Sequence, residues 1–246
     1  MTHPQPRTIA ITGAGTGIGA ACARRFAARG ERVVLIGRRR PPLDALAAET
    51  GGLAVAGDAA STADWARLLP EIAGRFGPVD ALVACAGGHG IGRADETDDA
   101  QWRDAMHANL DTAFVSARAC LPDLIAQRGS IVLVASIAAL AAGPGVCGYT
   151  VGKHALLGLA RSLARDYGPH GVRANAVCPG WVRTPMADAE MAPLMSAYGD
   201  TLDGAYARVS ADVPLRRAAD PDEIAAVCAF LASPDASFVT GATLVA

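Results

Sequence analysis

Short runs of β-branched and other apolar residues alternate along the whole chain with longer segments in which apolar residues recur at helical spacing. Seven such runs are present, the third of them weaker than the rest: Thr8–Ile11, Val33–Ile36, Leu53–Ala56, Val79–Val83, Ile131–Val134, Arg173–Val177 and Ala242–Val245. Continuous apolar strands alternating with helices are typical of a parallel sheet covered on both faces. We therefore predict a doubly wound α/β fold with a seven-stranded parallel sheet, in a single domain over residues 1–246.

The composition excludes several classes of protein. Of the 246 residues, 51% are hydrophobic and 19% charged, which excludes a disordered chain because such chains are polar and highly charged. The formal net charge is only −2, so no basic field is available to attract nucleic acid or an anionic membrane. We predict neither kind of partner.

The cysteines and the N-terminus indicate a reducing compartment. The six cysteines form no C-x-x-C pair and no zinc-like spacing, so we predict neither disulfides nor a metal site. The opening MTHPQPRTIA lacks the features of a signal peptide, and the longest apolar stretch, Ile131–Ala142, is too short to cross a bilayer. A cytoplasmic protein is expected.

A glycine-rich segment, Thr12–Gly19, follows the first predicted strand and leads into a helix from about Ile18 to Arg29. Glycine lets the backbone approach a ligand closely, and the free N–H groups at a helix N-terminus favour a pyrophosphate. An ordinary strand–helix turn is the alternative, but the position in the first βα unit favours a dinucleotide site of Rossmann type. The candidate contacts are Gly13, Gly15, Thr16, Gly17, Ile18 and Gly19.

The end of the second strand bears on the choice of cofactor. It reads Gly37-Arg38-Arg39-Arg40, without the acidic residue that binds the ribose 2′-hydroxyl of NAD. A guanidinium suits a 2′-phosphate, so Gly37 and Arg38 favour NADP(H), with NAD(H) possible. The alternative is that the arginines form a solvated turn. After the third strand, Asp58 and its neighbour Ala59 are candidates to contact adenine; for Asp58 a helix N-cap is an equal alternative.

A tyrosine and a lysine mark the predicted chemical centre. Lys153 is the only lysine among 22 basic residues, and Tyr149 lies four residues before it in a predicted helix over Tyr149–Tyr167. Side chains with this spacing share one helix face, and an ammonium near a phenol lowers the phenol's pKa. Tyr149 is therefore a candidate general acid and base. Ser136 follows the fifth strand, at the ligand side of the sheet.

Together the segment TGAGTGIG, Ser136, the Tyr149-x-x-x-Lys153 pair and Cys178-Pro179-Gly180 resemble the short-chain dehydrogenases/reductases. The resemblance spans almost the whole chain, and its motifs are specific in combination. It implies a Rossmann-type fold, NAD(P)-dependent interconversion of an alcohol and a carbonyl, and a homotetramer or dimer.

The same resemblance assigns further residues. Asn109, in the predicted helix Trp102–Phe114, matches the family's fourth catalytic residue, beside Ser136, Tyr149 and Lys153. The remaining positions are expected to contact the cofactor, the last four of them at the nicotinamide carboxamide: Ala86, Gly87, Pro179, Gly180, Val182 and Thr184.

Three features depart from the family pattern. Ala84 and Cys85 stand where two asparagines often brace the sheet, which we expect to affect rigidity more than chemistry. The chain ends at Ala246 without the usual Asp-Gly-Gly stretch, which leaves two alternatives: the chain is truncated, or its tail was not observed. The loop Gly88–Gly92 is unusually rich in glycine; its His89 is expected in solvent rather than on the substrate.

The substrate pocket is expected between the loop after Ser136 and a variable segment at about residues 185–213. That segment offers Met and Tyr side chains and no arginine between Arg183 and Arg208, so a small neutral alcohol or ketone is predicted. Small residues on the Tyr149 helix suggest contact with another subunit, and Cys147 is expected to be a packing residue. The alternatives are an NAD-dependent dehydrogenase of a sugar, polyol, steroid or cyclic alcohol, and a non-enzymatic dinucleotide sensor.

Overall fold

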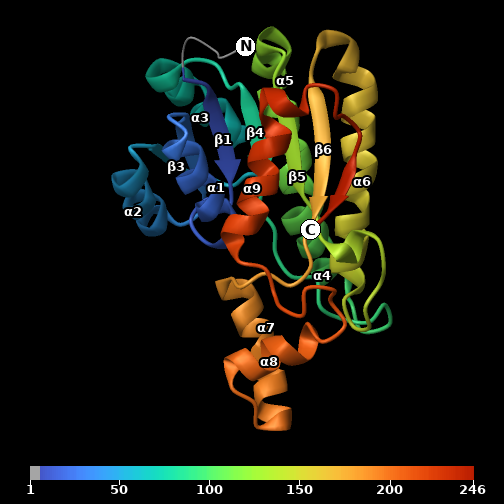
Figure 1. Ribbon diagram of the computed structural model, residues 1–246. Coiled ribbons are helices and arrows are strands. Elements are labelled where there is room, and N and C mark those ends of the chain that lie inside the picture. Colours follow the sequence, from blue (N-terminus) through green and yellow to red (C-terminus); the bar gives the residue numbers. More distant parts are fainter. Residues whose placement is uncertain (1–5) are drawn as a thin grey trace.

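The computed structural model describes residues 6–246 and contains one seven-stranded sheet in the order β3-β2-β1-β4-β5-β6-β7 (Figure 1). Residues 1–5, which the predicted domain includes, lie outside the described part. All neighbouring strands are parallel. The strands are β1 (Thr8–Thr12), β2 (Arg32–Gly37), β3 (Leu53–Ala56), β4 (Ala81–Ala84), β5 (Ser130–Val134), β6 (Arg173–Cys178) and β7 (Thr243–Val245). The predicted fold class is confirmed.

The order of the strands determines where a ligand can bind. From β1 the chain proceeds outward to β2 and β3, then returns across β1 to β4 and proceeds the other way. Successive connections therefore diverge beside β1, which leaves a crevice at the carboxyl ends of β1 and β4.

Helices cover both faces of the sheet because strand side chains alternate between two cores. Ile9 and Ile11 pack with α1, α2 and α9, whereas Ala10 packs with α3, α5 and α6. Figure 1 shows α9 and α1 in front of the strands. These helices are α1 (Gly17–Ala28), α2 (Arg40–Thr50), α3 (Thr62–Phe76), α5 (Thr112–Gln127), α6 (Cys147–Tyr167) and α9 (Pro221–Ala232).

The predicted helix Trp102–Phe114 is in fact three helical segments joined end to end. A short α4 (Asp99–Met106) passes into a π-helical turn, η1 (His107–Asp111), and then into α5. A π turn inside a helix changes the direction of the side chains that follow, and such turns are frequent at functional sites. Short 3₁₀ turns occur at η2 (Ile137–Ala139), η3 (Gly168–His170) and η4 (Pro234–Ala236).

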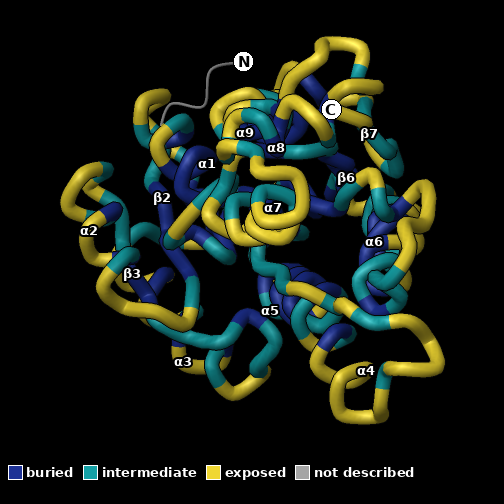
Figure 2. Tube along the Cα trace, turned by 90° about the horizontal axis from the view of Figure 1, so that it is seen from below, coloured by how far each residue is buried: buried dark blue, intermediate teal, exposed yellow. Residues whose placement is uncertain are grey.

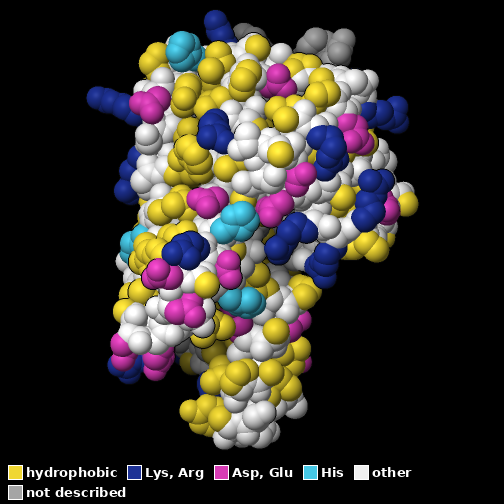
Figure 3. All heavy atoms as spheres, turned by 180° about the vertical axis from the view of Figure 1, so that it is seen from behind, with side chains coloured by type: hydrophobic (Ala, Val, Ile, Leu, Met, Phe, Trp, Pro, Cys, Tyr) yellow, Lys and Arg dark blue, Asp and Glu magenta, His cyan; other side chains and the backbone are white. Residues whose placement is uncertain are grey.

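Two helices, α7 (Pro185–Tyr198) and α8 (Leu202–Val209), project beyond the carboxyl ends of the strands (Figure 1). Seen along that direction, α7 lies over the middle of the molecule (Figure 2). They share a small core of their own in which Met191 and Tyr206 are fully buried. Both side chains belong to the segment expected to border the substrate pocket, and they hold α7 and α8 together. Hydrophobic side chains also gather on the outside of this projection (Figure 3).

Two further observations concern the membrane and the cysteines. Among residues 6–246, no helix combines the length and apolar character needed to cross a membrane. All six cysteines are free thiols, and Cys147 is partly buried at the start of α6.

Candidate active site

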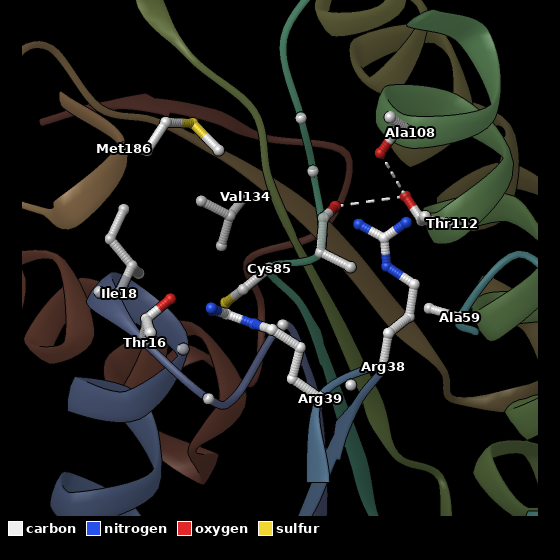
Figure 4. Close-up of a pocket in the computed structure, with 18 of the residues that line it drawn as sticks. Thr16, Ile18, Arg38, Arg39, Ala59, Cys85, Ala108, Thr112, Val134 and Met186 are labelled. Carbon is white, nitrogen blue, oxygen red and sulfur yellow. Dashed lines mark hydrogen bonds between the residues drawn. The ribbon is translucent and has the colours of Figure 1, made fainter. Parts of the chain in front are cut away.

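A cleft of about 720 Å³ opens at the carboxyl ends of β1, β2 and β4, and we call it the cofactor cleft (Figure 4). Most of the sequence-predicted cofactor residues line it. They are Gly13, Gly15, Thr16, Gly17, Ile18, Gly19, Gly37, Arg38, Asp58, Ala59, Ala86, Gly87, Tyr149, Lys153 and Thr184.

The glycine-rich turn forms a narrow floor of backbone. Gly13 has φ +65°, and a Cβ there would lie 2.8 Å from the Ala86 nitrogen. Gly17 has φ +55°, and its Cβ would lie 3.1 Å from the Thr184 side chain. Only glycine meets both demands, a left-handed backbone and no side-chain volume. Since α1 begins at Gly17, its free N–H groups lie at this floor, and the donor set fits a dinucleotide pyrophosphate.

Two threonines brace the turn after β4. The Ala86 N–H donates to Thr12 Oγ1 (3.1 Å). The single hydroxyl proton of Thr112 is shared between the carbonyls of Ala86 (Oγ1 to O, 3.2 Å) and Ala108 (2.9 Å; Figure 4). We expected the absence of asparagines before Ala86 to leave the sheet less rigid. Both backbone groups of Ala86 are nevertheless held, by threonines from β1 and from the start of α5.

The three arginines after β2 separate into two roles. Arg38 and Arg39 line the cofactor cleft, and the guanidinium of Arg38 points towards Thr112 (Figure 4). Arg40 instead begins α2 and pairs with Asp44, Nε to Oδ1 at 2.7 Å, on the exposed surface. Arg38 and Arg39 are exposed to solvent and also line the cleft, so both guanidinium groups can be reached by a ligand bound there.

Asp58 lies in the same part of the cleft. Its Oδ1 accepts from the Ala60 N–H (2.9 Å), and its Oδ2 lies 3.3 Å from His107 Nε2. Burial alone would raise the pKa of this carboxyl, but Ala60, His107 and Arg38 hold it below the usual value. The N-cap of α3 is Ser61, not Asp58. The alternative N-cap role is therefore wrong.

Lys153 and Tyr149 lie on one face of α6 at the inner end of the cleft. Lys153 is only 6% exposed, and its Nζ donates to the carbonyl of Val134 (3.1 Å) at the end of β5. The same Nζ lies 5.6 Å from the centre of the Tyr149 ring. Burial lowers the pKa of Lys153 to about 8. A permanently charged arginine would not respond to burial in this way.

The pKa of Tyr149 moves opposite to our expectation. Burial raises it above the usual value of a phenol; the Ser136 hydroxyl opposes this change, and the Glu190 carboxylate adds to it. We expected Lys153 to lower this pKa. Lys153 is itself buried and directed to the Val134 carbonyl, so in the protein alone the cost of burying a phenolate prevails.

Ser136 caps the 3₁₀ turn that follows β5. Its Oγ accepts from the Ala138 N–H (3.1 Å), which holds the side chain in place while leaving the hydroxyl proton available to another acceptor. The neighbouring Ile137 N–H donates to the carbonyl of Pro179 (2.9 Å). The loops after β5 and β6 are thereby tied together.

The glycine-rich loop after β4 packs directly on the start of α6. A Cβ on Gly90 would lie 2.2 Å from the Tyr149 nitrogen, and that nitrogen donates to the Gly90 carbonyl (3.2 Å). Asn109, buried in the π turn, donates from Nδ2 to the carbonyls of His89 (3.0 Å) and Ala105 (3.1 Å). At Gly90 the absence of a side chain is therefore a packing requirement that lets the loop contact the backbone of Tyr149.

Five predicted residues lie outside the lining of the cleft. Asn109 is buried in the π turn, and Ser136 caps the 3₁₀ turn after β5. Pro179 and Gly180 follow β6, where the Gly180 N–H donates to the Ala246 carbonyl (2.8 Å), and Val182 is buried. Thr184, which does line the cleft, caps α7 by accepting from the Ala187 N–H (3.2 Å).

His89 is half exposed, as we expected, but it is not isolated. Its Nδ1 lies 3.3 Å from Oε1 of Glu190 on α7. Sequence reasoning missed Glu190, and it also missed His107 and Thr112 in the cleft. None of them has a distinctive sequence neighbour; only the fold brings them to the site.

Comparison with known proteins shows which proteins this chain is similar to. A family model described as Enoyl-(Acyl carrier protein) reductase matches residues 13–246. Protein MoaE of Klebsiella aerogenes is 53% identical over 241 residues, 98% of this chain and 93% of that protein. Meso-2,3-butanediol dehydrogenase of Serratia marcescens is 35% identical over 97% of this chain and 92% of its own length.

A solved structure agrees with these relatives. L-sorbose reductase of Gluconobacter frateurii, complexed with NADPH and L-sorbose, superposes with a TM-score of 0.91 at 28% identity, over 98% of this chain and 95% of the other. With the glycine turn, Tyr149 and Lys153 lining one cleft, this chain belongs to the short-chain dehydrogenase/reductase family.

Proposed function

We propose that this chain is an NADP(H)-preferring oxidoreductase that interconverts a secondary alcohol and a ketone. The observation that carries the proposal is the position of Tyr149 and Lys153. Both line the inner end of a cleft whose floor is backbone and whose outer wall holds two arginines. A proton-transferring group thus stands at one end of a space suited to a dinucleotide.

The proposed roles follow from the contacts of each side chain. Tyr149 exchanges a proton with the substrate oxygen, and the Ser136 hydroxyl donates a hydrogen bond that orients that oxygen. Lys153, with a pKa of about 8, holds a proton near Tyr149 and can pass it on. Asn109 holds the loop after β4 in place by donating to the His89 carbonyl, and it thereby supports proton transfer at Tyr149, on which this loop packs.

The nicotinamide dinucleotide, when bound, supplies the hydride acceptor or donor. The glycine turn would hold its pyrophosphate, Asp58 its adenine, and Arg38 with Arg39 a 2′-phosphate. For the nicotinamide end we propose Thr184, with Pro179, Gly180 and Val182 behind it. L-sorbose reductase, a structural relative, was solved with NADPH.

The proposed substrates are small neutral hydroxylated compounds. The names of two relatives point the same way, since meso-2,3-butanediol and L-sorbose each carry more than one hydroxyl or carbonyl oxygen. The structure adds that Met186, an apolar side chain, lines the cleft on the α7 side (Figure 4).

The test is a pair of fluorescence titrations with NADPH and NADH, followed by assays with a panel of secondary alcohols and ketones. We expect at least tenfold tighter binding of NADPH, about 1.4 kcal/mol, and turnover that is visible as a change in NADPH absorbance. Arg38→Asp should shift the ratio of the two dissociation constants towards NADH, with Arg40→Asp as the control. An unchanged ratio would show that Arg38 does not contact the 2′-phosphate.

We also propose a homo-oligomer, a dimer or tetramer, in the cytoplasm. Exposed apolar side chains on α4, α5 and α6 support the assembly: Trp102 is 39%, Phe114 44% and Val151 41% exposed. Gly152 does not contribute to it, because it packs inward on Asn109. A monomeric mass by light scattering would contradict the assembly. The location rests on six free thiols, which suit a reducing compartment.

A further inference from the structure

One acidic side chain near the proposed chemical centre has no role in the reaction described above. Glu190 lies on α7 four residues after Met186, and residues at this spacing share a helix face. Met186 lines the cleft, and Glu190, which is outside the lining, lies one helical turn further along the same face of α7.

Glu190 is held in place from the other side of the site. Its Oε1 lies 3.3 Å from His89 Nδ1, in the loop between β4 and α4. That loop is anchored, because the His89 carbonyl accepts from Asn109 Nδ2 (3.0 Å) and the next residue, Gly90, packs on the backbone of Tyr149. Glu190 is therefore tied to the segment that positions the proposed proton donor.

The charge of Glu190 acts on Tyr149. Besides burial, the Glu190 carboxylate is what raises the pKa of the Tyr149 phenol, so the two groups influence each other through the space between α7 and α6. The Glu190 side chain retains 38% exposure and is thus accessible to a ligand. A carboxylate is a hydrogen-bond acceptor only, and it forms its strongest bonds with donors such as hydroxyl groups.

We propose that Glu190 is a specificity-determining residue: it accepts a hydrogen bond from a second hydroxyl of the substrate, and the site therefore selects diols and polyols over monohydric alcohols and over hydroxy acids. His89 acts as a positioning residue that holds the carboxylate towards the substrate. The inference rests on the proposed function, since it concerns the substrate of the same site.

The first experiment compares butane-2,3-diol with butan-2-ol, which differ by one hydroxyl. For the wild type we expect kcat/KM to be about tenfold higher for the diol, the size of effect typical for a hydrogen bond to a charged group. Glu190→Ala should remove most of this ratio, and any change in the pKa of Tyr149 that alters kcat/KM for both alcohols alike cancels in the ratio. Glu71→Ala, an exposed glutamate on α3 outside the cleft, is the matched control and should keep the wild-type ratio.

A second comparison isolates the charge. The anion 3-hydroxybutyrate should be a poor substrate of the wild type, because two carboxylates would approach each other. Glu190→Gln keeps the side-chain shape and should raise kcat/KM for 3-hydroxybutyrate several-fold. The proposal would be overturned if Glu190→Ala lowered kcat/KM equally for every substrate, or if it changed kcat/KM for none of them.

A binding measurement makes the result independent of turnover. In the Tyr149→Phe background with NADP⁺ present, calorimetry should show butane-2,3-diol binding about tenfold more weakly once Glu190→Ala is added. An equal dissociation constant in the two proteins would overturn the role of Glu190 even if the proposed function holds. If the wild type binds NADPH but oxidises none of these alcohols, the proposed function fails, and this inference fails with it.

Discussion

The cofactor cleft and the α7–α8 projection meet at the same site but are built differently. The cleft is formed largely by backbone: glycine turns, strand ends, and an Ala86 peptide held by Thr12 and Thr112. The projection packs around its own small core and is joined on its surface by exposed ion pairs such as Arg183–Asp203 at 2.7 Å.

The difference separates two tasks of the molecule. A dinucleotide requires the same contacts in every reaction. The backbone that supplies these contacts lies between two large cores and therefore has little freedom to change. The projection touches the cleft through few residues, Thr184, Pro185 and Met186 among them. Side chains such as Glu190 can therefore vary the substrate without disturbing the cofactor site.

The largest effect on activity should come from Tyr149, which lies where the cofactor cleft and the projection meet. Tyr149→Phe removes the transferable proton and should lower kcat at least ~10²-fold, the usual contribution of a general acid or base. The NADPH dissociation constant should stay within about twofold, since the ring and its packing remain. A variant with near-normal turnover would refute the assignment of Tyr149.

The buried ammonium of Lys153 should lower the free energy of unfolding. Lys153→Met should raise the free energy of unfolding near pH 7 by roughly 2 kcal/mol while abolishing activity, because it removes a desolvated ammonium. Exposed Arg161→Met on the same helix is the control and should change stability little.

The pH dependence checks the sign of this effect. The pKa of Lys153 is about 8 in the folded protein and near 10.5 unfolded, so below pH 8 both states are protonated and the wild type bears the full cost. Between these values the unfolded state binds more protons, so wild-type stability rises with pH. We expect the excess free energy of unfolding of Lys153→Met over the wild type, measured by urea denaturation, to decrease from pH 8 to 10. An excess that increases over this range would contradict the burial of a charged Lys153.

The backbone character of the cofactor cleft can be tested at one glycine. Gly13→Ala forces a side chain into a left-handed conformation and against Ala86, at a cost of about 1–2 kcal/mol from the backbone alone. We expect NADPH to bind roughly tenfold more weakly, as measured by fluorescence titration. Gly74→Ala on α3 is the control: its Cβ meets nothing within 4 Å, so the variant should bind normally. Equal behaviour of the two variants would contradict a cradle built from backbone.

The smallest effect is expected in the projection. Asp203→Asn breaks the exposed Arg183–Asp203 pair, in which Asp203 is 82% exposed, and should change the free energy of unfolding by less than about 0.5 kcal/mol. Cofactor affinity should not change. A clear loss of NADPH binding would show that the two regions are coupled, and the contrast drawn between them would no longer hold.

Local features of the chain predicted much of the fold and of the proposed site. Apolar runs identified all seven strands because buried parallel strands need side chains that are apolar on both faces. The i,i+4 spacing placed Tyr149 and Lys153 on one helix face, since that geometry depends only on the helix. The boundaries differ slightly: α6 begins at Cys147, two residues before the predicted start.

Other properties depend on groups that meet only in the folded chain. The pKa of Tyr149 is raised because burial prevails over the charge of Lys153, and burial is not a property of the sequence spacing. The π turn likewise contains Asn109, whose side chain donates to the His89 carbonyl in the loop after β4. For the same reason, the spacing of Met191 and Tyr206 fits a pocket or a core, and the folded chain places both in a small core.

The sequence alone therefore determined the strand and helix alternation, the glycine turn and the Tyr149–Lys153 spacing, because each is a regularity within a short segment. The tertiary structure alone decided that Arg38 and Arg39 line the cleft while Arg40 pairs outside, that threonines brace Ala86, and that Glu190 meets His89. These contacts join distant parts of the chain or depend on the direction of a side chain. Only the packed fold brings distant segments together and fixes side-chain directions.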